Sequence, residues 1–186
     1  RIQDLGAIGS KKIQRQIRPW RHSLSEDVYV VLGIPEEKLG YRLASMAELE
    51  DSKTKPEVWL EQAVKNLVKT VSTSTEGGAL IKGKDGRWMV FDMPNTDGIS
   101  GLILAKGFRA KMLDFFQLEE VGAAVPNRNV LVLFDPNEFT SVKPVRARTH
   151  QLYDTQNHPG FRGLLTVHRD GVSTMEPGNP KKKKKR

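Results

Sequence analysis

Few side chains in this sequence have the types and spacings that metal chemistry requires. His150 and Asp154 are four residues apart, so on a helix they would face each other either as half of a metal site or as a solvated pair. The solvated pair is favoured, because none of the four histidines has the close histidine neighbour of a helical zinc motif. The chain contains no cysteine, which excludes disulfides and thiolate metal sites. We therefore predict no metal.

Three short motifs resemble those of enzymes, but each lacks a residue on which the chemistry depends. The run Gly98-Ile99-Ser100-Gly101-Leu102 has leucine where a nucleophile elbow needs a small residue, so Ser100 is predicted to be a turn or cap residue. The segment from Gly6 to Lys11 lacks the spacing of a phosphate-binding loop. Glu36-Glu37-Lys38 resembles a nuclease motif without its aspartate. The sequence thus predicts no catalytic residues and no cofactor.

Two polar residues, Asn66 and Arg128, stand out because each lies in an otherwise apolar or structural pattern. If buried, an amide and a guanidinium both need hydrogen-bond partners, so the two could form a shared polar site. The simpler interpretation is that Asn66 faces solvent on a helix and Arg128 is an exposed turn residue. The simpler interpretation is favoured, and the shared site is kept as a hypothesis.

A run of six cations ends the sequence: Lys181, Lys182, Lys183, Lys184, Lys185 and Arg186. Such a run on a disordered tail attracts RNA, DNA or an anionic membrane surface, with an affinity that falls as salt rises. In a eukaryote it would indicate a nuclear import signal. In a bacterium it would indicate a solubilising tail or one that binds nucleic acid weakly.

The net charge of +8 is concentrated at the two ends of the chain. Residues 1–21 and 181–186 hold 12 of the 30 basic residues and one of the 22 acidic residues, which leaves residues 22–180 with a net charge of −3. A nucleic-acid-binding fold carries its cations on the folded surface, so the total charge says little about the partner of the folded part. No apolar run approaches the roughly 20 residues of a membrane-spanning helix, and we expect a soluble cytoplasmic protein.

The length predicts one folded domain over residues 22–176, between a basic N-terminal segment (1–21) and a disordered lysine-rich tail (177–186). The clearest strands are Val121–Val125 and Val130–Phe134. The second has five apolar residues without alternation, which is typical of a strand covered on both faces. Pro126 and Asn127 are predicted to occupy the two central positions of the turn between them.

Other elements follow from turn signals and from helical spacing. Further strands are predicted at 28–32, where Gly33 and Pro35 would end the strand, and in two hairpins, 79–81 with 87–93 and 163–168 with 172–175. Helices are predicted from Pro56 to Val71, from Lys106 to Phe116, and from Pro144 to about Asn157. The order predicts an α+β fold, with a largely antiparallel sheet built from hairpins and about three helices mainly on one face.

Three segments, in their order along the chain, resemble the YtpQ-like family of bacterial proteins. They are the helical run Trp59–Leu67, the strand-turn-strand Val121–Asp135 with Ala124-Val125-Pro126-Asn127-Arg128, and the segment Pro159–Val172 with Val167-His168-Arg169-Asp170-Gly171. The resemblance covers roughly residues 35 to 175 and leaves out the basic ends. It implies a fold and a class, and it supplies no catalytic residues.

We therefore expect a non-catalytic interaction protein whose folded domain binds another protein, with a basic tail that contacts polyanions. One alternative is an RNA- or ribosome-associated protein. A second is an enzyme with a dispersed acid/base site, to which Asp92 and Asp97 could contribute.

Overall fold

The computed structural model describes residues 19–24, 28–36, 40–74, 78–83, 86–93, 96, 98–155 and 160–175. The chain divides into two compact units, Arg1–Ala63 and Val64–Arg186, and the boundary lies inside helix α3. We call them the N-terminal and C-terminal units. The domain predicted over residues 22–176 spans both. The predicted tail (177–186), and the predicted basic segment up to residue 18, lie outside the described residues.

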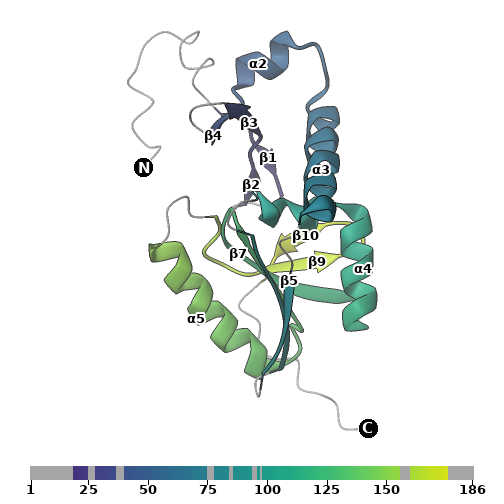
Figure 1. Cartoon of the computed structure of the whole chain (residues 1–186), viewed down its shortest axis with the longest axis vertical. Helices are drawn as coiled ribbons and strands as arrows, with labels where there is room; N and C mark the ends of the chain where they lie inside the picture. The colour runs from purple at the N-terminus through teal and green to yellow at the C-terminus, as the bar shows by residue number, and fades with distance from the viewer. Residues whose placement is uncertain are drawn as a thin grey trace. The chain divides into compact units, whose positions relative to one another are not determined.

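The described residues form helices and strands, most of which Figure 1 labels. In chain order they are β1 (His22–Ser23), β2 (Tyr29–Val30), β3 (Gly33–Glu36), β4 (Gly40–Leu43), α2 (Met46–Asp51), α3 (Pro56–Thr73), β5 (Gly78–Gly83), β6 (Gly86–Asp92), the 3-10 helix η2 (Ile99–Leu104), α4 (Lys106–Phe116), β7 (Glu120–Asn127), β8 (Val130–Phe134), α5 (Phe139–Thr155), β9 (Leu165–His168) and β10 (Val172–Thr174). The predicted α+β class with antiparallel strands is confirmed.

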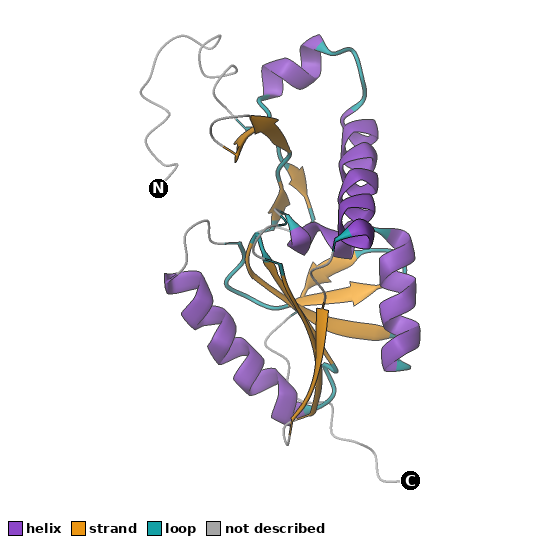
Figure 2. Ribbon diagram, in the orientation of Figure 1, coloured by secondary structure: helices purple, strands orange, loops and turns teal. Residues whose placement is uncertain are grey.

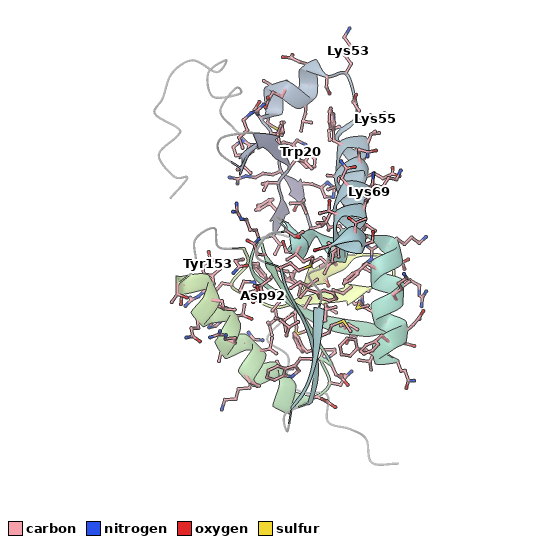
Figure 3. All side chains as sticks on the ribbon, in the orientation of Figure 1. Trp20, Lys53, Lys55, Lys69, Asp92 and Tyr153 are labelled. Atoms are coloured by element: carbon pink, nitrogen blue, oxygen red, sulfur yellow. The ribbon has the colours of Figure 1, made fainter. Side chains whose placement is uncertain are left out.

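Two small hairpins, β1–β2 and β3–β4, form the sheet structure of the N-terminal unit. Backbone hydrogen bonds link them, since Trp20 N donates to Ala44 O and Ala44 N donates to Leu32 O, both at 2.9 Å. Trp20, labelled in Figure 3, is buried with Leu32, Ala44 and Leu49 in the core of this unit. Gly33 was predicted to end the first strand. After a short break, Gly33 instead begins β3, where it pairs with Leu43.

Helix α2 begins with a capping box that also includes an ion pair. The Ser45 hydroxyl accepts from Glu48 N at 3.2 Å, and the Glu48 carboxylate accepts from Ser45 N at 2.9 Å. Both terminal nitrogens of Arg42 donate to the same carboxylate, one of them at 2.8 Å. The Arg42 and Ser45 hydrogen bonds favour the ionised form and lower the pKa of Glu48 to about 2.

The C-terminal unit is built on one antiparallel sheet of six strands, in the order β10-β9-β7-β8-β6-β5. Strand β8 lies between β7 and β6, and all five of its side chains are buried. The prediction of a central strand covered on both faces is therefore confirmed. The predicted hairpins β5–β6, β7–β8 and β9–β10 are also confirmed.

Helices cover both faces of this sheet (Figures 1 and 2). Helix α5 packs on the face that carries Ala124 and Val132, which Val145 contacts in one apolar cluster. Helix α4 and η2 pack on the other face, where the Phe108 ring meets the edge of Phe91 with centroids 5.6 Å apart. The helices packed on this sheet thus lie on opposite faces instead of mainly on one, because β8 has apolar side chains on both.

The β7–β8 turn differs from the prediction by two residues. Arg128 and Asn129 form the turn, and Asn127 pairs with Val130. Pro126 lies in a bulge of β7, where Val125 and Pro126 together oppose Leu131. Since the ladder is already interrupted there, the missing N–H of proline is tolerated. The bulge also frees two carbonyls, and these accept from Phe161 N at 2.8 Å and from Gly160 N at 2.9 Å.

Helix α5 begins one turn earlier than predicted, at Phe139 instead of Pro144. Asn137 N donates to the Asp135 carboxylate at 2.8 Å, which turns the chain after β8, and Val142 N donates to Glu138 O at 3.2 Å. Val142 also joins the apolar cluster under α5. Partial burial of this side chain favours the earlier start over the local preference for proline in the first turn.

A buried arginine links η2 to the β9–β10 turn through hydrogen bonds. The Arg109 guanidinium donates to Ile103 O at 3.2 Å, Leu104 O at 2.6 Å and Arg169 O at 3.3 Å. Burial lowers the pKa of Arg109 and the negative charge of Asp170 opposes this effect. These carbonyls end a helix and a turn, so they would otherwise lack donors.

We expect Arg109→Met to lower the free energy of unfolding by about 2–4 kcal/mol, because one buried and two partly buried carbonyls lose a charged donor while the side-chain volume is kept. Urea denaturation measures this change. The matched control is Arg169→Met, which removes only an exposed pair with Asp114 at 3.3 Å and should change stability by less than about 0.5 kcal/mol. Equal effects of the two substitutions would contradict the assigned role of Arg109.

The Glu48 carboxylate predicts an acid-dependent loss of stability in the N-terminal unit. A folded-state pKa of about 2, against 4.5 for the free group, means that the stabilisation is complete above pH 4.5 and is lost as the pH falls to about 2. Glu48→Gln should lower the melting temperature at pH 7, and its difference from the wild type should vanish near pH 2. Circular dichroism melts across this range measure it. A constant difference at every pH would show that the charge of Glu48 does not contribute.

Candidate functional site

The two polar residues singled out in the sequence lie on different elements. Asn66 is exposed on α3, and its carbonyl accepts from the Thr70 hydroxyl at 3.0 Å. Arg128 is half-buried in the β7–β8 turn, and its Nε donates to Asn129 Oδ1 at 3.2 Å. The shared polar site of Asn66 and Arg128 stays a prediction.

The other candidate groups are dispersed over the described part of the chain. Asp154 pairs with Arg162 at 3.2 Å on the exposed surface, and His168 lies 3.3 Å from the Ser173 hydroxyl. Ser100 lies within η2, so it does not occupy a strand-to-helix elbow. No group of three metal-binding side chains occurs among the described residues.

Asn129, which the sequence analysis passed over, joins two loops of the C-terminal unit. The side-chain amide nitrogen of Asn129 donates to Met93 O at 3.3 Å and to Thr96 O at 3.2 Å. The backbone carbonyl of Asn129 accepts from Met93 N at 3.1 Å. Asn129 N donates to the Asn127 carboxamide at 2.9 Å, which fixes the turn. The sequence signal that could have indicated this role of Asn129 is the run Asn127-Arg128-Asn129, an Asn-x-Asn turn after a buried strand. The arrangement holds Met93 and Thr96, which follow β6, against the turn at the end of the sheet.

The N-terminal unit carries a different kind of feature, a segment that is apolar on both of its sides. Burial alternates along residues 28–34, so that Val28 and Leu32 are buried while Tyr29 and Val31 are 50% and 42% exposed. Leu43, opposite the exposed Gly33, is 41% exposed on the same outer side. We call Tyr29, Val31 and Leu43 the outer stripe.

Alternation along a strand normally places polar side chains on the wet face. The outer stripe departs from this rule, because it places an aromatic and two aliphatic side chains there. The guanidinium of Arg21 lies 5.6 Å from the centre of the Tyr29 ring, within the range of a cation–π interaction. Arg42 precedes Leu43 on β4 but lies opposite Ile34, so its side chain belongs to the other face of the hairpin. The stripe therefore has an apolar centre with one charged neighbour, Arg21.

The comparisons with family models, with curated proteins and with solved structures found no match to this chain. The YtpQ-like resemblance stays a prediction. None of the described helices is long and apolar enough to span a membrane.

We expect Asn129→Ala to lower the free energy of unfolding of the C-terminal unit by about 2 kcal/mol, since two carbonyls at buried positions lose their donor. Lys111→Ala is the matched control. It lies on an exposed position of helix α4 where alanine is the better helix former, so stability should change by less than about 0.5 kcal/mol. Chemical denaturation of both variants measures the difference. A loss from Lys111→Ala as large as that from Asn129→Ala would refute this assignment.

Proposed function

We propose that the chain is an interaction protein whose N-terminal unit binds another protein through the outer stripe. The observation that supports this proposal is the apolar outer side of residues 29–31 and of Leu43, in a segment whose inner side already supplies the core of the unit. An apolar side that contributes nothing to the core of its own unit is typical of a surface that a partner covers.

The composition of the stripe also fits a binding surface. Tyrosine and arginine are the residues that most often carry the energy of protein interfaces, and Tyr29 and Arg21 lie together here. Interfaces have an apolar centre that becomes fully buried and a polar rim that stays wet. Val31 and Leu43 would form such a centre, while Arg21 would belong to the rim.

The physical nature of this surface determines how the partner should behave. Burial of apolar area contributes about 25 cal/mol per Å², and salt does not screen it. Contacts made by exposed charges, in contrast, weaken with salt over a Debye length of about 3 Å at 1 M. A partner held by the outer stripe should therefore remain bound at high salt.

The test is affinity capture from native cells, with washes at about 0.5 M salt and identification of the retained proteins by mass spectrometry. The wild type and the variant Val68→Glu should retain the same partner, and Val31→Glu should lose it. Val68 is the matched control because it is 40% exposed, like Val31 at 42%, but lies on α3 in the other unit.

Both variants should fold, because each position is exposed and the substitution costs at most about 1 kcal/mol. Equal melting temperatures would confirm this. Purified partner and chain should then bind with at least a tenfold weaker affinity in Val31→Glu, or roughly 1.4 kcal/mol. A partner that is retained equally by Val31→Glu and the wild type would overturn the proposal, as would the absence of any protein retained at high salt.

A further inference from the structure

The six-stranded sheet of the C-terminal unit has two edge strands, β5 and β10, which differ in length (Figure 1). Strand β10 has three residues, whereas β5 has six. All six residues of β5 pair with β6 in unbroken register, from Gly78 opposite Phe91 to Gly83 opposite Gly86. Neither a proline nor a bulge interrupts β5. It therefore presents a long and regular edge.

The composition of β5 is unusual for an edge strand. Natural edge strands avoid pairing with other chains by being short or by carrying prolines, bulges or several charges. Strand β5 contains the apolar run Ala79-Leu80-Ile81 and a single charged residue, Lys82. The main contacts of α4 with the sheet are to β7 and β9, and those of α5 are to β6, β7 and β8. Neither helix packs mainly on β5, so its edge is open to a further strand.

The hydrogen-bond pattern of the sheet shows which backbone groups of β5 face outward. Met93 N donates to Asn129 O, so the backbone groups of Met93 point towards β8. This direction alternates along an antiparallel strand, so Val90 points towards β5, where it pairs with Ala79. The neighbours of Ala79 therefore point away from the sheet. The residues of β5 whose N–H and C=O groups face outward are Gly78, Leu80 and Lys82.

These three residues are self-complementary about Leu80. When two copies of β5 run antiparallel with Leu80 opposite Leu80, Gly78 of each copy lies opposite Lys82 of the other. Every outward N–H and C=O group of both strands then has a partner. A shift of the register by two residues would leave one outward residue of each strand unpaired. The symmetric register also keeps the two Lys82 charges apart, whereas like charges directly opposite each other are destabilising.

We propose that β5 pairs with β5 of a second copy of the chain, so that the sheets of two C-terminal units join in an antiparallel dimer. The twofold axis passes between the two Leu80 residues. Both copies use the same edge, so the assembly closes at a dimer, and the edges that remain are the short β10 strands. An unrelated extended peptide would make the same backbone hydrogen bonds. The symmetric register and the match of Gly78 with Lys82 favour a second copy.

The test is sedimentation velocity of the full chain over a series of concentrations up to about 100 μM. The wild type should sediment as a dimer that dissociates on dilution. Leu80→Glu and Leu80→Lys each place two like charges opposite each other at the twofold axis, so each should weaken the dimer roughly tenfold or more. An equimolar mixture of these two variants should form dimers again, because opposite charges then face each other.

The matched control is Thr174→Glu on the other edge strand. Met175 N donates to Leu164 O, so the backbone groups of Met175 point towards β9 and those of Thr174 point away from the sheet. Thr174 thus has the same kind of edge position as Leu80, and it is half-buried. The added charge should leave the dimer unchanged. Circular dichroism melts of all variants measure whether each one folds.

If either charged Leu80 variant misfolds, Leu80→Cys tests the same pairing. The chain contains no cysteine of its own. The Cα atoms of a hydrogen-bonded antiparallel pair lie about 5.5 Å apart, which is within the range of a disulfide. Oxidised glutathione should therefore link two Leu80→Cys chains into a covalent dimer on a non-reducing gel. Thr174→Cys should remain a single chain under the same conditions.

Four outcomes would overturn the proposal. The first is a wild type that stays monomeric at every concentration. The second is a loss of the dimer in Thr174→Glu as large as that in Leu80→Glu. The third is a mixture of the two folded Leu80 variants that stays monomeric. The fourth is a dimer that Val31→Glu abolishes and Leu80→Glu leaves intact, because the outer stripe would then join the two copies.

Discussion

The arrangement of the C-terminal unit depends on one constraint: β8 has no polar side chain on either face. Its five residues are buried between β7 and β6, so both faces of the sheet need a cover. Helix α5 supplies the cover on one side, and η2 with α4 supplies it on the other. Small residues make room for this packing; a side chain at Gly122 would collide with the ring of Phe134.

In a sheet buried on both faces, the backbone groups that need hydrogen-bond partners outside the ladder lie at the ends of the strands. There the backbone leaves the ladder, and each freed carbonyl or N–H needs a partner. Three features supply these partners. At the bulge of Pro126, two carbonyls accept from the backbone N–H groups of Gly160 and Phe161. Elsewhere the side-chain amide of Asn129 and the guanidinium of Arg109 donate to backbone carbonyls. The side chains of Asn129 and Arg109 are thereby committed to main-chain partners. Exposed surfaces remain for contacts with other molecules.

Local patterns predicted the elements well, and non-local contacts account for the errors. The β7–β8 pair and helix α4 follow from apolar runs and turn residues that are close in sequence. The strong local preference of Pro144 predicts a helix start, but packing of the partly buried Val142 against a sheet that is distant in sequence favours a longer helix. The turn position of Pro126 was wrong for a similar reason, since the segment at Gly160 stabilises the bulge from 34 residues away.

The candidate surfaces were harder to predict than the fold. The apolar run at residues 28–32 indicated a strand, but only the burial of Leu32 and the exposure of Val31 show that its outer side is not part of the core. Asn129 was passed over in favour of Arg128, because the carbonyls that its amide binds belong to a loop more than 30 residues earlier.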